Sequence, residues 1–260
     1  MEIVSVAAFT DTPGRGNPAA VCFLPGPWPD ARLHAVAREL NLPATVFVLP
    51  DGPDWGLRWF APSAELELCG HGTLAAAHVL WELERAPAER PLVFATRAGV
   101  LTAERHAGLI DLDFPAEPAS TASAPPGLEE ALGVAVLRVA RNRLDWLAEL
   151  DTAGTVRSLS PDFPRLREIP TRGLIVTARA DVAGADFVSR FFAPRVGIDE
   201  DAVTGSAHCC LGPYWAPRLG KDTLIGHQLS ARGGTVRVRL LGHRVRLGGC
   251  AVIVGREELK

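Results

Sequence analysis

The sequence lacks the patterns that mark common metal and nucleotide sites. It has no Cys-x-x-Cys pair and no His-Glu-x-x-His segment, and its five cysteines and seven histidines are scattered. The segment Gly14-Arg15-Gly16 is not followed by the Lys-Ser/Thr pair of a phosphate-binding loop. We therefore predict no metal site and interpret this segment as a turn.

The odd number of cysteines and the lack of a signal-peptide pattern favour the reducing cytoplasm.

Two classes of partner also lack support. The chain has no run of Lys and Arg, its net charge is -3 and its pI is about 6.2. A protein of this charge has no basic stripe to neutralise phosphates, so we predict no nucleic-acid partner. No apolar stretch approaches the roughly 20 residues that span a bilayer, so we predict no membrane partner.

The chain is long enough for one large domain or two small ones, and 47% of its 260 residues are hydrophobic. The Pro-, Ala- and Ser-rich run 115–127 is the best candidate for a linker, which divides the chain into domains 1–115 and 116–260. The last strands could cross back to the first domain. Each half has strands, one apolar helix and further strands, with the apolar helices expected near 70–83 and 206–219. A further helix is expected over 185–192.

This repeated order predicts an α+β fold with mixed sheets, and not the regular alternation of a doubly wound fold. We expect two pseudo-symmetric domains, each with a curled, barrel-like mixed sheet around one central helix.

Two loop-to-helix turns carry most of the chemical information. They are the segments 69–78 (CGHGTLAAAH) and 201–210 (DAVTGSAHCC). In each, a glycine is followed by a polar side chain and then by small residues suited to a buried helix. Such a turn directs backbone N–H groups and a helix N-terminus at one place, which favours a carboxylate or a developing oxyanion. Two such turns predict a cleft between the halves that holds one small anionic substrate.

The polar residues of these turns have structural and functional interpretations. His71 either caps its helix or transfers a proton, and the matching second turn favours proton transfer. Asp201 is commonly a structural group at a helix start, but this turn would direct it into the cleft. Ser206 either binds a substrate carboxylate or caps the helix, and the sequence favours neither interpretation. Cys69, His78, His208, Cys209 and Cys210 are interpreted as packing residues, and Asp199 and Glu200 as solvated neighbours.

At these residues the chain resembles the PhzF family of phenazine biosynthesis proteins, which is related in fold to diaminopimelate epimerase. The resemblance spans nearly the whole chain and rests on the segments 8–9, 16–21, 58–62 with Glu65, 69–74, Asp201 with 203–208, 213–215 and 248–252. It implies two similar domains with a site between them, no metal, no organic cofactor and commonly a homodimer. By this likeness His71 and Asp201 are acid/base groups, and the substrate-binding residues are Asn17, Ala44, Gly70, Gly72, Thr73, Gly205 and Ser206.

The chain departs from the family at one important position. The family's catalytic carboxylate stands in an Asn-x-Ser-Glu-Thr segment, whereas this chain reads Asn-Leu-Pro-Ala-Thr over 41–45. Ala44 can neither take nor give a proton, and general acid–base catalysis typically contributes about 10²–10⁴-fold. Either another group moves the proton, or the substrate is already acidic enough, or the chemistry differs.

Three functions follow from these residues. The leading hypothesis is a cofactor-independent isomerase or tautomerase that moves a proton on a small cyclic or unsaturated amino acid, in the biosynthesis of a secondary metabolite such as an antibiotic. The alternative is a non-catalytic binding or pathway protein that keeps the cleft. An amino-acid epimerase ranks last, because Cys69 matches one of its two cysteines but Val203 stands where the second is expected.

Overall fold

The computed structural model describes residues 1–258, which form two compact units. The first unit holds Met1–Phe114 and the described residues from Arg246 onward, and the second holds Pro115–Val245. The run 115–127 is part of the second unit, where β9 (Ser120–Thr121) pairs with β10. Among the described residues, no helix is both long and apolar enough to cross a membrane.

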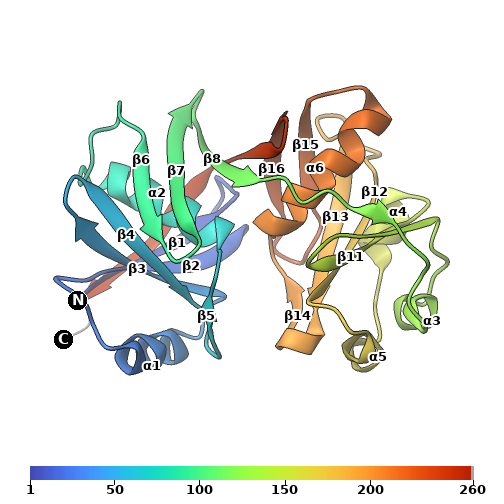
Figure 1. Cartoon of the computed structure of the whole chain (residues 1–260), viewed down its shortest axis with the longest axis horizontal. Coiled ribbons are helices and arrows are strands. Elements are labelled where there is room, and N and C mark those ends of the chain that lie inside the picture. Colours follow the sequence, from blue (N-terminus) through green and yellow to red (C-terminus); the bar gives the residue numbers. More distant parts are fainter. Residues whose placement is uncertain (259–260) are drawn as a thin grey trace. The chain divides into compact units, whose positions relative to one another are not determined.

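The first unit is a mixed sheet with one helix on each face (Figure 1). Paired neighbours run in the order β18, β1, β2, β3, β4, β6, β7, β8 and β17, and β5 pairs with β4. The pairs β2–β3 and β4–β6 are parallel, whereas β1–β2, β3–β4 and β6–β7 are antiparallel. The elements are β1 (Glu2–Ala8), β2 (Asn17–Phe23), α1 (Asp30–Leu40), β3 (Ala44–Asp51), β4 (Asp54–Phe60), β5 (Glu65–Leu66), α2 (Gly70–Glu82), β6 (Leu92–Thr96), β7 (Gly99–His106), β8 (Leu109–Pro115), β17 (Arg244–Gly249) and β18 (Ala251–Glu258).

The side chains of β3 alternate between two helices. Phe47 joins the apolar cluster that α1 makes with the sheet through Leu33, Val36 and Ala37. Val46 points the other way, toward Gly72 of α2. We call the α2 side the inner face of this sheet. Ten of the thirteen residues of α2 are buried, as expected for a helix that is apolar all round.

The second unit follows the same plan. Its pairing order is β9, β10, β11, β12, β13, β15 and β16, and β14 pairs with β13. The pairs β11–β12 and β13–β15 are parallel, and the others are antiparallel. The elements are α3 (Leu128–Leu132), β10 (Arg138–Arg141), β11 (Asp145–Glu149), α4 (Ala153–Ser158), α5 (Phe163–Glu168), β12 (Gly173–Arg179), β13 (Phe187–Ala193), the 3-10 turn η1 (Pro194–Val196), β14 (Ile198–Asp201), α6 (Gly205–Leu219), β15 (Thr223–Gln228) and β16 (Gly234–Leu241).

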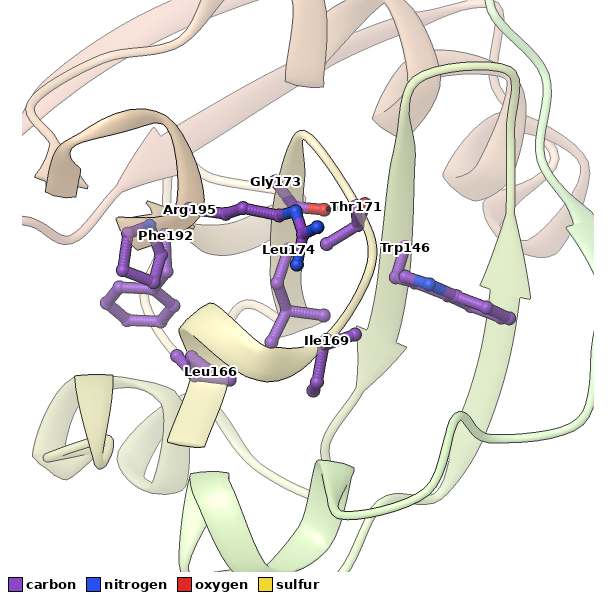
Figure 2. Close-up of a pocket in the computed structure, with 9 residues that line it drawn as sticks. Trp146, Leu166, Ile169, Thr171, Gly173, Leu174, Phe192 and Arg195 are labelled. Carbon is purple, nitrogen blue, oxygen red and sulfur yellow. Dashed lines mark hydrogen bonds between the residues drawn. The ribbon is translucent and has the colours of Figure 1, made fainter. Parts of the chain in front are cut away.

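The buried helix α6 lies on the inner face of the second sheet. Trp215 donates to Thr177 Oγ1 of β12 (3.0 Å), and Tyr214 donates to Glu149 Oε2 of β11 (2.6 Å). On the other face, α3, α4 and α5 cover a separate apolar cluster that includes Leu174 and Phe192. A cavity of about 10 Å³, room for about one water, lies in that outer layer beside Leu166 (Figure 2).

The two units repeat one another element by element. The antiparallel, parallel, antiparallel, parallel and antiparallel pairings of β1 to β7 recur in β10 to β16, and α2 and α6 occupy the same place in that order. The predicted α+β class, with a mixed sheet and a central helix in each half, is confirmed.

One element was predicted wrongly. Residues 185–192 were expected to form a helix, but Phe187–Ala193 is the strand β13, which has neighbours on both sides. The inner face carries Phe187 and Phe191, and the outer face carries Val188 and Phe192. Because both faces are covered, the segment lacks the alternation of polar and apolar residues that marks a half-buried strand.

Candidate active site

The first turn contains a histidine next to a cysteine thiol. Cys69 has an extended backbone (φ -142°, ψ 100°) and its side chain makes no capping hydrogen bond to α2. Its Sγ lies 3.6 Å from Nδ1 of His71. His71 is buried, with 7% of its surface exposed. A Cβ on Gly72 would lie only 2.9 Å from Trp59 Cδ1 and Val46 Cγ2. The glycine therefore lets α2 approach β3 and β4 closely and fixes where His71 stands.

Three other predicted residues of the first unit, Ala44, Asn17 and Thr73, are fully buried. Ala44 begins β3 and precedes by two residues Val46, which contacts Gly72, so alternation places it on the same face. Asn17 begins β2 and is fully buried. Thr73 is also fully buried, and its hydroxyl donates to the carbonyl of Cys69 (2.8 Å). This bond gives Thr73 a role in the helix start, and its contact with substrate stays a prediction.

The second turn holds Asp201 through two buried partners. Thr204 Oγ1 donates to Asp201 Oδ2 (2.5 Å). The amide of Gln228, on β15, accepts from the N–H of Thr204 (2.9 Å) and donates to the carbonyl of Asp201 (2.8 Å). Gln228 is 1% exposed. These bonds fix the backbone that carries Asp201 and orient its carboxylate, so the group is presented in one geometry.

Ser206 is the second residue of α6 and accepts a hydrogen bond from an arginine. Arg172 Nη2 donates to Ser206 Oγ (2.9 Å) and also to Asp145, and Arg172 Nε donates to Asp145 Oδ1 (2.9 Å). Asp145 begins β11, and its side chain is fully buried. Arg172 and Asp145 were not predicted, because the motif around Ser206 contains neither residue.

A matched pair of ion pairs precedes the two turns. Arg58 donates through Nε and Nη2 to Glu65 (2.7 and 2.8 Å), and Arg190 donates in the same way to Glu200 (2.7 and 2.9 Å). Each arginine begins an Arg-x-Phe-Ala-Pro segment, 58–62 and 190–194, and each glutamate stands five residues before the glycine that begins the buried helix. We call these the two arginine clamps.

The clamps correct the expectation for Glu200. They also identify a sequence repeat that the sequence analysis did not use. Glu200 was expected to be a solvated neighbour of Asp201, but it is bound by Arg190, whose side chain is 11% exposed. The repeat of Arg-x-Phe-Ala-Pro is visible in the sequence and marks equivalent positions in the two units. By this repeat, Ser206 corresponds to His71.

Three residues of α6 that were interpreted as packing groups, His208, Cys209 and Cys210, are buried. His208 is fully buried, its Nδ1 lies 2.8 Å from the carbonyl of Thr204, and burial lowers its pKa from 6.5 to about 4. Burial also raises the pKa of Cys210 to about 12 and raises that of Cys209. These thiols are protonated at neutral pH and are poor nucleophiles. Within residues 1–258 no group of three or more potential ligands could hold a metal ion.

Comparison with known proteins identifies the family. The family model described as phenazine biosynthesis-like protein matches residues 6–256. The chain belongs to this family. An uncharacterized isomerase of Halalkalibacterium halodurans is 48% identical over 258 residues, with 99% of this chain and 97% of that protein covered. A crystal structure of a PhzF-family phenazine biosynthesis protein from Enterococcus faecalis has a TM-score of 0.95 and 38% identity, and covers 100% of this chain and 98% of that one.

The predicted PhzF resemblance is therefore confirmed, and so is the epimerase-like fold. A structure described as a predicted epimerase from Pseudomonas aeruginosa matches with a TM-score of 0.76 at 24% identity, covering 99% of this chain and 98% of that one, and shows likeness of fold alone. The roles of His71, Asp201, Ser206 and the other predicted site residues stay predictions.

Proposed function

We propose that the protein is a cofactor-independent isomerase or tautomerase that moves a proton on a small cyclic or unsaturated amino-acid-like carboxylate. The observation that supports the proposal is the set of hydrogen bonds that hold Asp201 in place. Thr204 holds its carboxylate and Gln228 holds its backbone, beside the start of a buried helix. A carboxylate fixed in this way is suited to repeated proton transfer, and a relative that is 48% identical is named an isomerase.

The proposed reaction uses two groups. Asp201 removes a proton from a carbon next to a conjugated C=N bond, and the C–H electron pair moves into conjugation. His71 supplies a proton at the other end of the conjugated system. The starts of α2 and α6, which have no side-chain caps, stabilise the substrate carboxylate and the developing negative charge. Because Ala44 offers no carboxylate, the substrate is one whose proton is already labile, such as a pyrroline-type imine.

Deuterium exchange tests this assignment. The purified protein is incubated in D₂O with 1-pyrroline-2-carboxylate, and deuterium at carbon is followed by NMR after subtraction of the protein-free rate. Asp201→Asn keeps an oxygen that accepts from Thr204 but removes the base, so we expect exchange to fall at least about 100-fold. His71→Gln should also slow exchange. Arg157→Met, which alters an exposed surface ion pair with Asp181, is the control and should leave the rate unchanged. Equal exchange in the parent and in Asp201→Asn would overturn the assignment.

The rival function is ligand binding without turnover, and Ala44 is the observation that favours it. Under this function the parent catalyses no exchange, and Asp201→Asn keeps its ligand affinity. Ala44→Glu separates the two functions in the same assay. If the substrate is one with a labile proton, the added side chain crowds the inner face and slows the reaction. An inactive parent that gains exchange on Ala44→Glu would be a degenerate enzyme, and the leading proposal would fail.

The biological setting follows from the same proposal. A small unsaturated amino acid fits secondary-metabolite biosynthesis, including that of antibiotics, and the family resemblance implies a homodimer. Light scattering coupled to size-exclusion chromatography tests the dimer.

A further inference from the structure

We propose that Arg172 is a positioning residue, which orients the Ser206 hydroxyl to donate a hydrogen bond to the carboxylate of a bound ligand. The inference rests on the proposed function, because it assigns the groups that hold the carboxylate of that substrate. It arises from an arrangement on the inner face of the second unit. There Asp145, Arg172 and Ser206 form a connected chain of hydrogen bonds.

Asp145 fixes the guanidinium. Its fully buried carboxylate accepts from both Nε and Nη2 of Arg172, the two-pronged geometry that suits arginine and carboxylate. Gly173 follows Arg172 and leaves the necessary room, because a Cβ there would lie 2.2 Å from Phe191 Cζ and 3.1 Å from Asp145 Oδ1. The guanidinium carbon in turn lies 5.5 Å from the centre of the Phe191 ring. Arg172 is therefore held on two sides.

The bond from Arg172 determines which way the Ser206 hydroxyl can point. Ser206 Oγ accepts the N–H of Arg172, so its own hydrogen must be directed elsewhere. Within residues 1–258 that hydrogen has no acceptor, and Arg172 Nη1 has none either. Ser206 is partly exposed, and the Arg172 side chain is 37% exposed. A hydroxyl that accepts from a cation becomes a stronger donor, which suits a carboxylate ligand.

If the role of Arg172 is purely structural, a different result is expected. In that case Arg172 only neutralises the buried Asp145, and its loss lowers stability without a specific effect on carboxylate binding. If Arg172 acts through Ser206, its removal weakens binding in the parent but has little further effect once the Ser206 hydroxyl is gone. A double-mutant cycle measures that difference.

Binding of pyrrole-2-carboxylate, a planar carboxylate without a transferable C–H proton next to the carboxylate, tests the inference by calorimetry. We expect Arg172→Met and Ser206→Ala each to weaken binding by about 10- to 100-fold, and the double variant to be no weaker than Ser206→Ala alone. Arg172→Lys keeps the charge beside Asp145 but loses the two-pronged geometry. It should fold and still bind weakly, so it decides the question if Arg172→Met does not fold. Arg157→Met is again the matched control and should bind as the parent does.

Several outcomes overturn the inference. They are unchanged affinity in Arg172→Lys, additive losses in the double variant, or no binding of pyrrole-2-carboxylate by the parent at millimolar concentration. The assay is independent of turnover. Weakened binding in Arg172→Lys with no deuterium exchange in the parent would remove the proposed function and leave this inference standing. Exchange in the parent together with unchanged binding in Arg172→Lys would support the proposed function and overturn this inference.

Discussion

Ala44 and Ser206 differ in what surrounds them and in the chemistry that they offer. Ala44 brings no proton-transfer group to the inner face of the first unit. Ser206 is supported by Arg172 and Asp145, and its environment is built from polar groups. The chemistry that the sequence assigns to single residues therefore depends on neighbours that are remote in the chain. Asp145 lies 61 positions before Ser206.

His208 makes stability depend on pH, and this is a prediction at the residue scale. Burial lowers its pKa in the folded state from 6.5 to about 4. Below pH 6.5 the unfolded chain gains a proton that the folded chain does not, so the free energy of unfolding falls as pH drops from about 6.5 to about 4. The shift corresponds to a loss of about 3 kcal/mol over that window.

Denaturant unfolding of the parent and of His208→Asn at several pH values measures this effect. The difference between the two curves isolates His208, because the carboxylates titrate alike in both proteins. The difference should be flat above about pH 6.5 and change by a few kcal/mol below it. Parallel curves across the whole range would show that His208 does not carry the dependence.

At the scale of elements, the arginine clamps connect each buried helix to the outer layer. Arg58 also donates to Asp30 at the start of α1 (2.8 Å), and Arg190 also donates to the carbonyl of Leu159 just after α4 (2.5 Å). Each clamp therefore joins an outer helix to the short strand that leads into α2 or α6. This places the two turns relative to their own sheets.

Loss of a clamp should destabilise the protein and loosen its turn. Arg190→Met leaves Glu200 mostly buried and unpaired, and we expect a loss of about 3 kcal/mol or more in the free energy of unfolding. The double variant Arg190→Met with Glu200→Gln should recover part of this loss, because the uncompensated charge is gone. Thermal unfolding of both variants checks the prediction, and Arg157→Met serves as the exposed control. Equal stability of Arg190→Met and the parent would contradict it.

The buried helices were predictable because their signals are local. Glycines begin α2 and α6 at residues 70 and 205, close to the expected bounds, and the small apolar residues that follow mark a helix packed on all sides. The strand β13 was not predictable by alternation, because both of its faces are covered. Gln228 and Arg172 could not be assigned to the site, because strand pairing and folding bring them to the turns. The Arg-x-Phe-Ala-Pro repeat of the clamps is visible in the sequence. A comparison of the two halves would therefore have predicted that Glu200, like Glu65, is paired with an arginine.

At the scale of the whole molecule, the chain returns to its first unit at the end. β18 pairs antiparallel with β1, with Glu2 opposite Glu258, and β17 pairs with β8. A Cβ on Gly249 would lie 2.4 Å from Phe9 Cδ1 and 3.1 Å from Leu74 Cδ1, so the segment also packs closely near α2. The residues before 115 therefore lack part of their own sheet and core.

This connection predicts which fragments fold. A fragment of residues 1–114 exposes the apolar strand β1 as an unpaired edge, and we expect it to aggregate. Placing residues 246–258 before Met1, through a short Gly-Ser linker, turns β18 and β1 into a hairpin with the native antiparallel pairing. That permuted fragment should be monomeric and unfold cooperatively by circular dichroism. A permuted fragment with Gly249→Leu is the control, because its bulk clashes with Phe9 and should prevent folding. Cooperative unfolding of residues 1–114 alone would show that the returning strands are dispensable.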